Sequence, residues 1–318
     1  MQSTLANKNK LKSFLAKYKS IFGLIILCII ASLVSPRFLT TSNMMNVLTQ
    51  VSVNAVLAIG MTFVILSGGI DLSVGSILAI SGAVAATIIG STGSVLLSVI
   101  VAIVIGGLIG LFNGLVVAKG RIQAFIVTLA SMTIFRGVTY VFTNGTPISR
   151  LGDAFGALGN KRILGNNLPL PVIFTVIVLI LAYYILSETR YGRYLYALGG
   201  NEDSARLSGI DTNKIKTLVY VVSGAAAALS GIIVTSRIGS ASPNAGMGFE
   251  LDAIAAVVIG GTSLSGGEGS VIGTMVGALI IGVLNNSLNL MNVSPFYQAI
   301  IKGIVILAAV LIDKRERK

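Results

Sequence analysis

The segment of residues 46–66 reads NVLTQVSVNAVLAIGMTFVIL, and it contains no charged side chain. An α-helix rises about 1.5 Å per residue, so this segment is long enough to cross a hydrocarbon core of about 30 Å. Nine other segments are comparably apolar, and their limits are 20–35, 72–90, 94–118, 122–143, 169–186, 214–238, 250–264, 269–290 and 296–312. The sequence therefore predicts an all-α, polytopic membrane protein with about ten transmembrane helices, which form one domain over 20–312.

The composition places the chain in the same class. Hydrophobic residues make up 54% of the 318 and charged residues only 11%, with a mean hydropathy of +0.91. A soluble domain carries about 25% charged residues, so soluble and disordered classes are excluded. The net charge of +12 could indicate a nucleic-acid partner. The basic residues lie in short flanks between the apolar segments, however, as in membrane proteins, so no nucleic-acid partner is expected.

The N-terminal tail, residues 1–19, carries five lysines ahead of the apolar run Ile21–Val34. Secretory signals share this arrangement, but no A-x-A-like cleavage site follows, and we interpret the run as an uncleaved first span. The apolar residues between the lysines follow helical spacing and predict a short interfacial helix in this tail. A second basic tail covers residues 313–318.

Metal and nucleotide sites have little support in this sequence. It contains no histidine and a single cysteine, Cys28, so a metal site built from nitrogen and sulfur ligands is not expected. It also lacks a G-x-x-x-x-G-K-[ST] phosphate loop. The LSGGE at residues 264–268 is therefore interpreted as a tight turn between membrane segments. We expect no cofactor bound by this chain.

The distribution of lysine and arginine predicts the orientation in the membrane. If the N-terminus is cytoplasmic and there are ten spans, the inner segments hold sixteen of these residues and the outer segments five. Because positive charge favours the cytoplasmic side, both termini are expected inside. Residues 187–216 then form a cytoplasmic loop, and residues 144–168 form an irregular extracytoplasmic loop.

The cytoplasmic loop 187–216 reads SETRYGRYLYALGGNEDSARLSGIDTNKIK and is the longest charged interruption between apolar segments. Gly199-Gly200 divides it. Asn201 follows as a helix cap, acidic residues occupy the next turn, and Gly209 stops the helix. The loop therefore predicts a short helix, Glu202–Gly209, that lies on the membrane surface and receives a partner.

Glycine patterns suggest repetition and close packing. GGIDLSVG (Gly68–Gly75) and GGTSLSGG (Gly260–Gly267) match at five of eight positions, which we interpret as a weak internal repeat. Convergent turn chemistry is the alternative. Glycines four residues apart, such as Gly106 and Gly110, predict close helix packing within the chain, with a homodimer face as the alternative.

Charged residues within membrane segments are candidates for function. Arg136, Lys302, Glu250 and Asp252 all fall in the predicted outer half, and we expect them to pair with one another. Contact with a substrate is the alternative. Asp71 follows the first Gly-Gly and is expected to cap the helix that comes next.

A hydroxylated solute needs donors and acceptors that replace water while it crosses a membrane. Uncharged polar residues inside the spans could line such a path, although each could equally form a hydrogen bond between helices. The candidates are Asn54, Thr62, Asn113, Asn285, Asn286 and Asn289. The sequence contains no nucleophile–base pair or paired catalytic carboxylates, so an enzyme is not expected.

Four longer stretches resemble one family. They are SVNAVLAIGMTFVILSGGIDLSVGS (Ser52–Ser76), AKGRIQAFIVTLASM (Ala118–Met132), RYGRYLYALGGNEDSARLSGI (Arg190–Ile210) and ELDAIAAVVIGGTSLSGGEGS (Glu250–Ser270). In this order they are similar to the permease subunits of bacterial ABC importers for ribose and related monosaccharides.

The resemblance implies partners and a mechanism. A second permease chain, expected as a homodimer, would work in the bacterial inner membrane with cytoplasmic ABC ATPase subunits, which bind ATP and Mg. An extracytoplasmic sugar-binding protein would deliver the monosaccharide, with D-ribose as the first choice. An ion-coupled secondary sugar transporter is the alternative, and a passive channel or scaffold is a third hypothesis.

Importer permeases of this kind carry an EAA-x-x-x-G pattern in the loop that docks on the ATPase. Asp203-Ser204-Ala205, followed by Gly209, matches its spacing, with Asp and Ser in place of Glu and Ala. The resemblance therefore assigns coupling to the ATPase to Asn201, Glu202, Asp203, Ser204, Ala205, Arg206 and Gly209.

Overall fold

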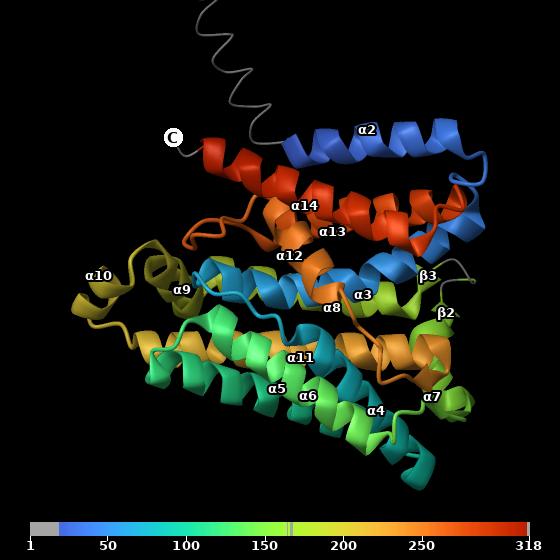
Figure 1. Cartoon of the computed structure of the whole chain (residues 1–318), viewed down its shortest axis with the longest axis horizontal. Coiled ribbons are helices and arrows are strands. Elements are labelled where there is room, and N and C mark those ends of the chain that lie inside the picture. The colour runs from blue at the N-terminus through green and yellow to red at the C-terminus, as the bar shows by residue number, and fades with distance from the viewer. Residues whose placement is uncertain (1–18, 164, 166–167, 317–318) are drawn as a thin grey trace, which may run out of the picture.

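The computed structural model describes residues 19–163, 165 and 168–316, so most of the predicted N-terminal tail, with its interfacial helix, lies outside the described residues. The described chain is mostly helical, and most of the long helices lie along the long axis of the molecule (Figure 1). The long helices are α2 (Lys19–Val34), α3 (Thr41–Leu66), α4 (Val74–Thr92), α5 (Val95–Gly120), α6 (Ala124–Phe142), α8 (Leu170–Glu188), α11 (Thr212–Ile238), α13 (Val271–Leu290) and α14 (Pro295–Glu316). The short helices are α7 (Gly152–Asn160), α9 (Arg190–Gly200), α10 (Glu202–Leu207) and α12 (Phe249–Ile259).

Each of the ten predicted apolar segments coincides with one helix. Seven of these helices, α3, α4, α5, α6, α8, α11 and α13, are long and apolar enough to cross a membrane. The apolar parts of α2 and α14 are shorter, and α12 has only 11 residues. The end of α14 and the pair α9–α10 lie toward one end of the molecule, here named the α10 end, and α7 lies at the opposite α7 end (Figure 1). The helix α2 runs toward the α7 end, so its start is on the side of the α10 end.

Two helices begin inside the bundle instead of at its ends. The chain leaves α3 at the α10 end and returns inward through the non-helical residues 67–73 before α4 begins (Figure 1). It leaves α11 at the α7 end and returns through residues 239–248 before α12 begins. The two helix starts meet, because a Cβ on Gly75 would lie 2.4 Å from the carbonyl oxygen of Gly246.

These returns reveal an inverted repeat of two four-helix units. In α3–α6 the first helix runs to the α10 end, and the chain then returns inward and begins a helix inside (Figure 1). In α11–α14 the first helix runs to the opposite, α7 end, and the chain again returns inward and begins a helix inside. The matching stretches Gly68–Gly75 and Gly260–Gly267 are not equivalent within this repeat, because the first precedes α4 and the second follows α12. The weak repeat of these two stretches is therefore a different pairing from the inverted repeat, and it stays a prediction.

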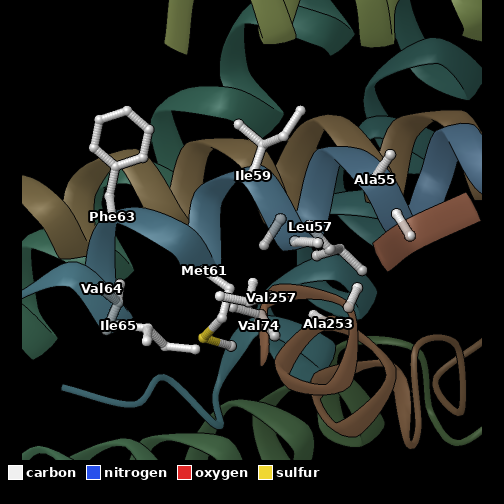
Figure 2. Close-up of a cluster of buried hydrophobic side chains, with 14 of the residues drawn as sticks. Ala55, Leu57, Ile59, Met61, Phe63, Val64, Ile65, Val74, Ala253 and Val257 are labelled. Atoms are coloured by element: carbon white, nitrogen blue, oxygen red, sulfur yellow. The ribbon is translucent and has the colours of Figure 1, made fainter. Parts of the chain in front are cut away.

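Close packing of α11 on α5 depends on glycine. A Cβ on Gly110 would lie 2.1 Å from the Tyr220 carbonyl oxygen, and a Cβ on Gly224 would lie 2.1 Å from that of Gly106. The glycine spacing thus serves packing within the chain, as predicted. On the other side of the core, Figure 2 shows Met61 of α3 beside Val257 of α12 and Val74 of α4, all fully buried.

The loop 144–168 is more ordered than the predicted irregular loop. It contains α7 and the strands β1 (Ile148–Ser149), β2 (Arg162–Ile163) and β3 (Leu168–Pro169). β1 pairs with β4 (Ser240–Ala241), and β2 pairs with β3. The physical reason is Phe155 of α7, which is fully buried in an apolar cluster with Ile232 of α11 and therefore holds the loop against the bundle.

Candidate functional site

The pair α9–α10 projects from the α10 end, and local hydrogen bonds define its two helices. The side chain of Asn201 accepts a hydrogen bond from the Ser204 backbone N–H at 2.8 Å, which caps α10. Gly209, with φ of +84°, ends the helix, and the N–H of Ile210 donates to the Ala205 carbonyl at 3.1 Å. The predicted short helix and its cap are confirmed.

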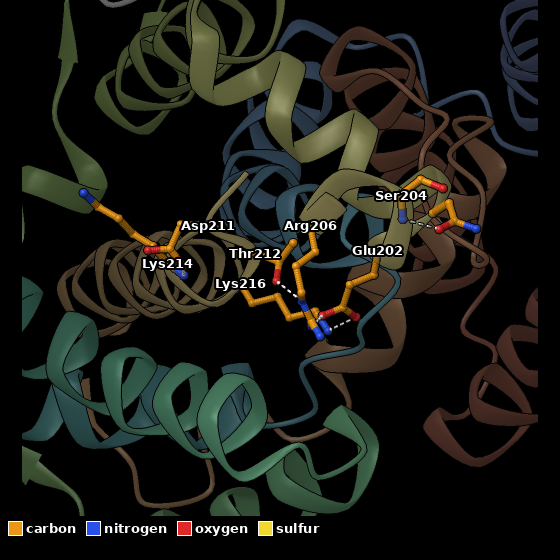
Figure 3. A network of polar contacts seen from close by, with 8 residues as sticks. Glu202, Ser204, Arg206, Asp211, Thr212, Lys214 and Lys216 are labelled. Carbon is orange, nitrogen blue, oxygen red and sulfur yellow. Dashed lines mark hydrogen bonds and ion pairs between the residues drawn. The ribbon is translucent and has the colours of Figure 1, made fainter. Parts of the chain in front are cut away.

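Glu202 ties α10 to the start of α11. One carboxylate oxygen accepts from Arg206 at 2.8 Å, and the other forms an ion pair with Lys216 (Figure 3). Partial burial raises the pKa of Glu202, but the two cations lower it more, so its pKa lies below the ordinary value. Asp211 adds a cap by accepting from the Lys214 N–H at 3.0 Å. The ion pair with Lys216 therefore links α10 to the start of α11.

The outer surface of α10 is polar except for one leucine. Asp203 and Ser204 are exposed, whereas Ala205 is buried beneath the helix. Leu207 is 90% exposed. Sequence reasoning missed Leu207, since the only available signal was an apolar residue within a six-residue polar helix.

Three glycine-containing turns meet under α9. A Cβ on Gly199 would lie 1.8 Å from the Leu66 carbonyl oxygen and 2.4 Å from the Gly267 nitrogen. Gly267 in turn donates its N–H to the Leu66 carbonyl at 3.0 Å. A Cβ on Gly266 would lie 2.9 Å from the Gly68 nitrogen. The end of α9 therefore rests directly on the backbone of the turns after α3 and α12, and we name this contact the glycine junction.

A cavity of about 480 Å³ lies beside α10, and another of about 580 Å³ lies beside α7. The walls of the cavity beside α10 come from the Gly68-Gly69 turn, the connection between α5 and α6, α10 and the first turns of α11. The lining residues are Ser67, Gly68, Gly69, Val117, Ala118, Arg121, Ile122, Gln123, Ala124, Glu202, Asp203, Arg206, Lys216 and Tyr220. A shift of α10 would change the shape of this cavity, because the helix supplies part of its wall.

The return 67–73 is held by a buried carboxylate. Asp71 is fully buried, and it accepts hydrogen bonds from the Ser73 N–H at 3.0 Å and the Ser73 hydroxyl at 2.5 Å. Its other oxygen accepts from the Ser223 hydroxyl at 2.8 Å. The prediction that Asp71 caps α4 was wrong, since α4 begins after Ser73 and has no side-chain cap. Asp71 instead fixes the turn that precedes the helix.

The four charged residues of the outer half pair only in part. The Lys302 ammonium donates to an Asp252 carboxylate oxygen at 2.9 Å, as expected. Arg136 instead donates from Nη1 to two backbone carbonyls of the return 239–248, those of Pro243 at 2.6 Å and Ala245 at 2.8 Å. Glu250 accepts from the Gly248 N–H at 3.2 Å.

Three of the six path candidates form hydrogen bonds that join α13 to α3 or to α14. The Thr62 hydroxyl lies 2.8 Å from that of Thr274. Asn286 exchanges two amide bonds with Asn43, at 3.0 and 2.9 Å. The Asn289 oxygen accepts from the Gln298 amide at 2.9 Å. These bonds join α3 to α13 and α13 to α14.

The other three candidates lie in different surroundings. Asn113 is fully buried and donates to the Ser73 hydroxyl at 2.9 Å. Asn285 donates to Asp252 at 3.5 Å. Asn54 is half-buried on α3. Among the described residues no hydrogen bond joins any two of the six.

Comparisons with known proteins agree with one another. The profile described as "Branched-chain amino acid transport system / permease component" matches residues 43–310. The "Ribose import permease protein RbsC" of Escherichia coli strain K12 is 54% identical over 310 residues, which cover 96% of each chain. RbsC of Bacillus subtilis strain 168 is 50% identical over 92% of this chain and 91% of its own. The "D-allose transport system permease protein AlsC" of Escherichia coli strain K12 is 41% identical over 95% of this chain and 92% of its own. No solved structure matches the chain.

Proposed function

Because this chain belongs to the family of branched-chain amino acid transport system permease components, we propose that it is the membrane permease of an ATP-binding-cassette importer for D-ribose. Its high identity with ribose import permeases, over nearly the whole chain, supports ribose as the substrate and argues against the ion-coupled alternative. The chain is a transport subunit and not an enzyme.

The observation that carries the proposal is the placement of α10 directly after α9, whose end forms the glycine junction. Leu207 and the polar residues around it face outward, while the end of α9 contacts the turns that follow α3 and α12. A partner that binds α10 can therefore displace both turns at once. The residues proposed for this coupling are Asn201, Glu202, Asp203, Ser204, Ala205, Arg206 and Gly209, and we add Leu207 as the apolar anchor.

The proposal includes the surroundings of the chain. The α10 end faces the cytoplasm, so both termini are inside, and the ten apolar helices lie in the bacterial inner membrane. The sixteen-to-five distribution of basic residues supports this orientation. The loop 144–168 then faces outward, toward a sugar-binding protein. Two copies of the chain form a homodimer, and the cytoplasmic ATPase partners bind ATP and Mg.

Transport follows from two conformations of this assembly. ATP binding and hydrolysis close and open the partner ATPases, and α10 passes this movement through the glycine junction to α3, α4, α12 and α13. The chain neither makes nor breaks a covalent bond. It supplies surfaces whose relative stability in the two conformations sets the direction of transport.

Replacement of Leu207 by Asp tests the docking role. Burial of this exposed leucine in a partner pocket is worth at least about 1.4 kcal/mol, so Leu207→Asp should weaken association with the ATPase by at least about tenfold. The measurement is co-purification of the partner together with ATPase activity stimulated by ribose-loaded binding protein. Leu39→Asp is the matched control, since Leu39 is also exposed but precedes α3 at the α7 end. Equal association of both variants with the ATPase would contradict the docking role.

The substrate is tested separately. Ribose-loaded binding protein should stimulate the ATPase activity of the assembled wild-type complex, and the mass of the intact complex should correspond to two permease chains. Stimulation by another loaded sugar but not by ribose would remove ribose and leave the transporter class intact. A single permease chain in the complex would remove the homodimer.

A further inference from the structure

A group of polar side chains surrounds the return 239–248, and neither the docking role of α10 nor the six path candidates include them. Arg136 and Tyr140 lie one helical turn apart on the same side of α6. Arg136 binds the carbonyls of Pro243 and Ala245, and the Tyr140 hydroxyl donates to the Asn244 side-chain oxygen. The two side chains therefore hold the turn from α6, on both sides of Asn244.

This group is accessible in the single chain. Asn244 is exposed, Tyr140 is 39% exposed and Met247 is 64% exposed. The turn of this group reaches inside the bundle, where Gly246 contacts the start of α4, whereas Tyr140 lies near the end of α6. Irregular backbone and polar side chains at membrane depth are tolerated only against protein or water, and not against lipid. This surface must therefore face a partner chain or a water-filled path.

The chemistry of the group suits a polyhydroxylated solute. The bonds of Arg136 to the turn use Nη1 alone, so its Nε and Nη2 groups remain as donors. The Asn244 amide supplies two further N–H donors, and the Glu250 carboxylate at the start of α12 supplies acceptors. A sugar hydroxyl both donates and accepts, and it needs both kinds of partner when it leaves water.

We propose that Arg136, Tyr140, Asn244 and Glu250, here named the return-turn site, contact the sugar while it crosses between two copies of the chain. This inference rests on the proposed function and adds the residues that contact the substrate. These differ from the six asparagine and threonine candidates that sequence reasoning selected. The site is incomplete in a single chain, because the second copy must cover the exposed side of the turn.

Asn244→Ala tests the site without disturbing the bonds between Arg136 and the turn. The assembled transporter is supplied with saturating binding protein, loaded with ribose or with ribose analogues that each lack one hydroxyl. We expect Asn244→Ala to slow ribose transport about tenfold, the equivalent of one lost hydrogen bond. At least one deoxy analogue should be slowed much less, so that selectivity for ribose over that analogue falls.

Thr133→Ala is the matched control, because Thr133 is exposed on α6 and its hydroxyl bonds only to the carbonyl of Leu129 in its own helix. It should change neither rate nor selectivity. If Asn244→Ala slows all sugars by one common factor, or slows none, the return-turn site is wrong. If the wild-type complex shows no ribose transport, the proposed function is wrong, and this inference, which rests on it, is wrong as well.

Cysteine labelling gives a second, independent test. With Cys28 replaced by Ser, Asn244→Cys supplies the single thiol of the chain. During ATP turnover a charged, hydrophilic thiol reagent should modify it, because the site faces a hydrated path. Leu181→Cys on α8, which is 55% exposed, should stay unmodified on the lipid side. An unmodified Asn244→Cys during turnover would overturn the proposal.

Discussion

Gly199 illustrates how a single residue type determines the contact beneath α9. Its neighbour Gly200 has no atom within 4 Å of the position where a Cβ would lie, whereas a Cβ on Gly199 would collide with backbone atoms of Leu66 and Gly267. Backbone atoms cannot rotate away as a side chain can. The glycine junction therefore depends on Gly199 and not on Gly200, although the two are adjacent in sequence.

Gly199→Ala should accordingly be much more harmful than Gly200→Ala. Relief of the collision requires α9 to move away from both turns, at a cost of about 1–3 kcal/mol, as for other overpacked sites. We expect a lower thermal midpoint for the Gly199 variant, together with reduced transport. The Gly200 variant is the control and should resemble the wild type. Equal midpoints for the two variants would show that the junction tolerates a side chain.

At this scale the sequence predicted local bonds well and distant ones poorly. Asn201 as a cap and Gly209 as a stop follow from residues within one turn of each other. The role of Asp71 could not be predicted, because its partner Ser223 is 152 positions away and the two meet only when α11 packs against the return. The bonds of Arg136 to the carbonyls of the return 239–248 could not be predicted either, because those partners are also more than 100 positions away.

At the scale of one element, α10 is a helix of six residues that relies on its ends. So short a helix is not stable by itself in water. Its side-chain cap and its ion pairs to α11 therefore decide whether α10 keeps its shape before a partner binds.

Asn201→Ala removes the bond to the Ser204 N–H and should cost about 1 kcal/mol of local stability. Amide hydrogen exchange of residues 202–207 should then be faster, and the coupled ATPase activity should fall. Asn201→Asp keeps a capping oxygen and should restore both properties. A slow-exchanging α10 in the alanine variant would mean that the cap is dispensable.

The attachment of α10 to α11 should depend on pH through Glu202. Because the pKa of Glu202 is lower in the folded chain than in the unfolded chain, its ion pairs stabilise the fold above the ordinary glutamate pKa of about 4.3. This stabilisation is lost as the pH falls through the lower folded value. Hydrogen exchange of α10, corrected for its intrinsic dependence on pH, should therefore accelerate below about pH 4.3.

Glu202→Gln carries no carboxylate and is the control for this effect. Its exchange should be faster at neutral pH and should change little on acidification. An unchanged pH dependence in this variant would assign the titration to another group.

The positions of the long helices could be predicted from the sequence, but the helix starts and ends inside the bundle could not. The apolar segment 72–90 includes Leu72, yet α4 begins only at Val74, because the Asp71–Ser73 turn occupies the residues before it. The segment 250–264 predicted a span, whereas α12 ends at Ile259, and its 11 residues rise only about 16 Å. Hydropathy cannot distinguish a full span from a half helix joined to an apolar turn.

At the scale of the whole molecule, the two ends of the bundle can be told apart by experiment. In a chain without Cys28, Asn160→Cys places a thiol on α7, and Leu207→Cys places one on α10. We expect a membrane-impermeant reagent added to intact cells to label only the α7 position. The α10 position should react after lysis. Labelling of Leu207→Cys from outside would reverse the proposed orientation.

The inverted repeat described above also bears on the origin of the chain. The units α3–α6 and α11–α14 share one plan, but they run in opposite directions along the bundle. Duplication of a gene yields this arrangement most simply if the ancestral four-helix protein could insert either way. Such an ancestor needs little bias in its basic residues, because that bias sets the direction of insertion. The present excess of lysine and arginine on one side would then be a later acquisition, which arose once the two halves were fused and each had to keep a single direction.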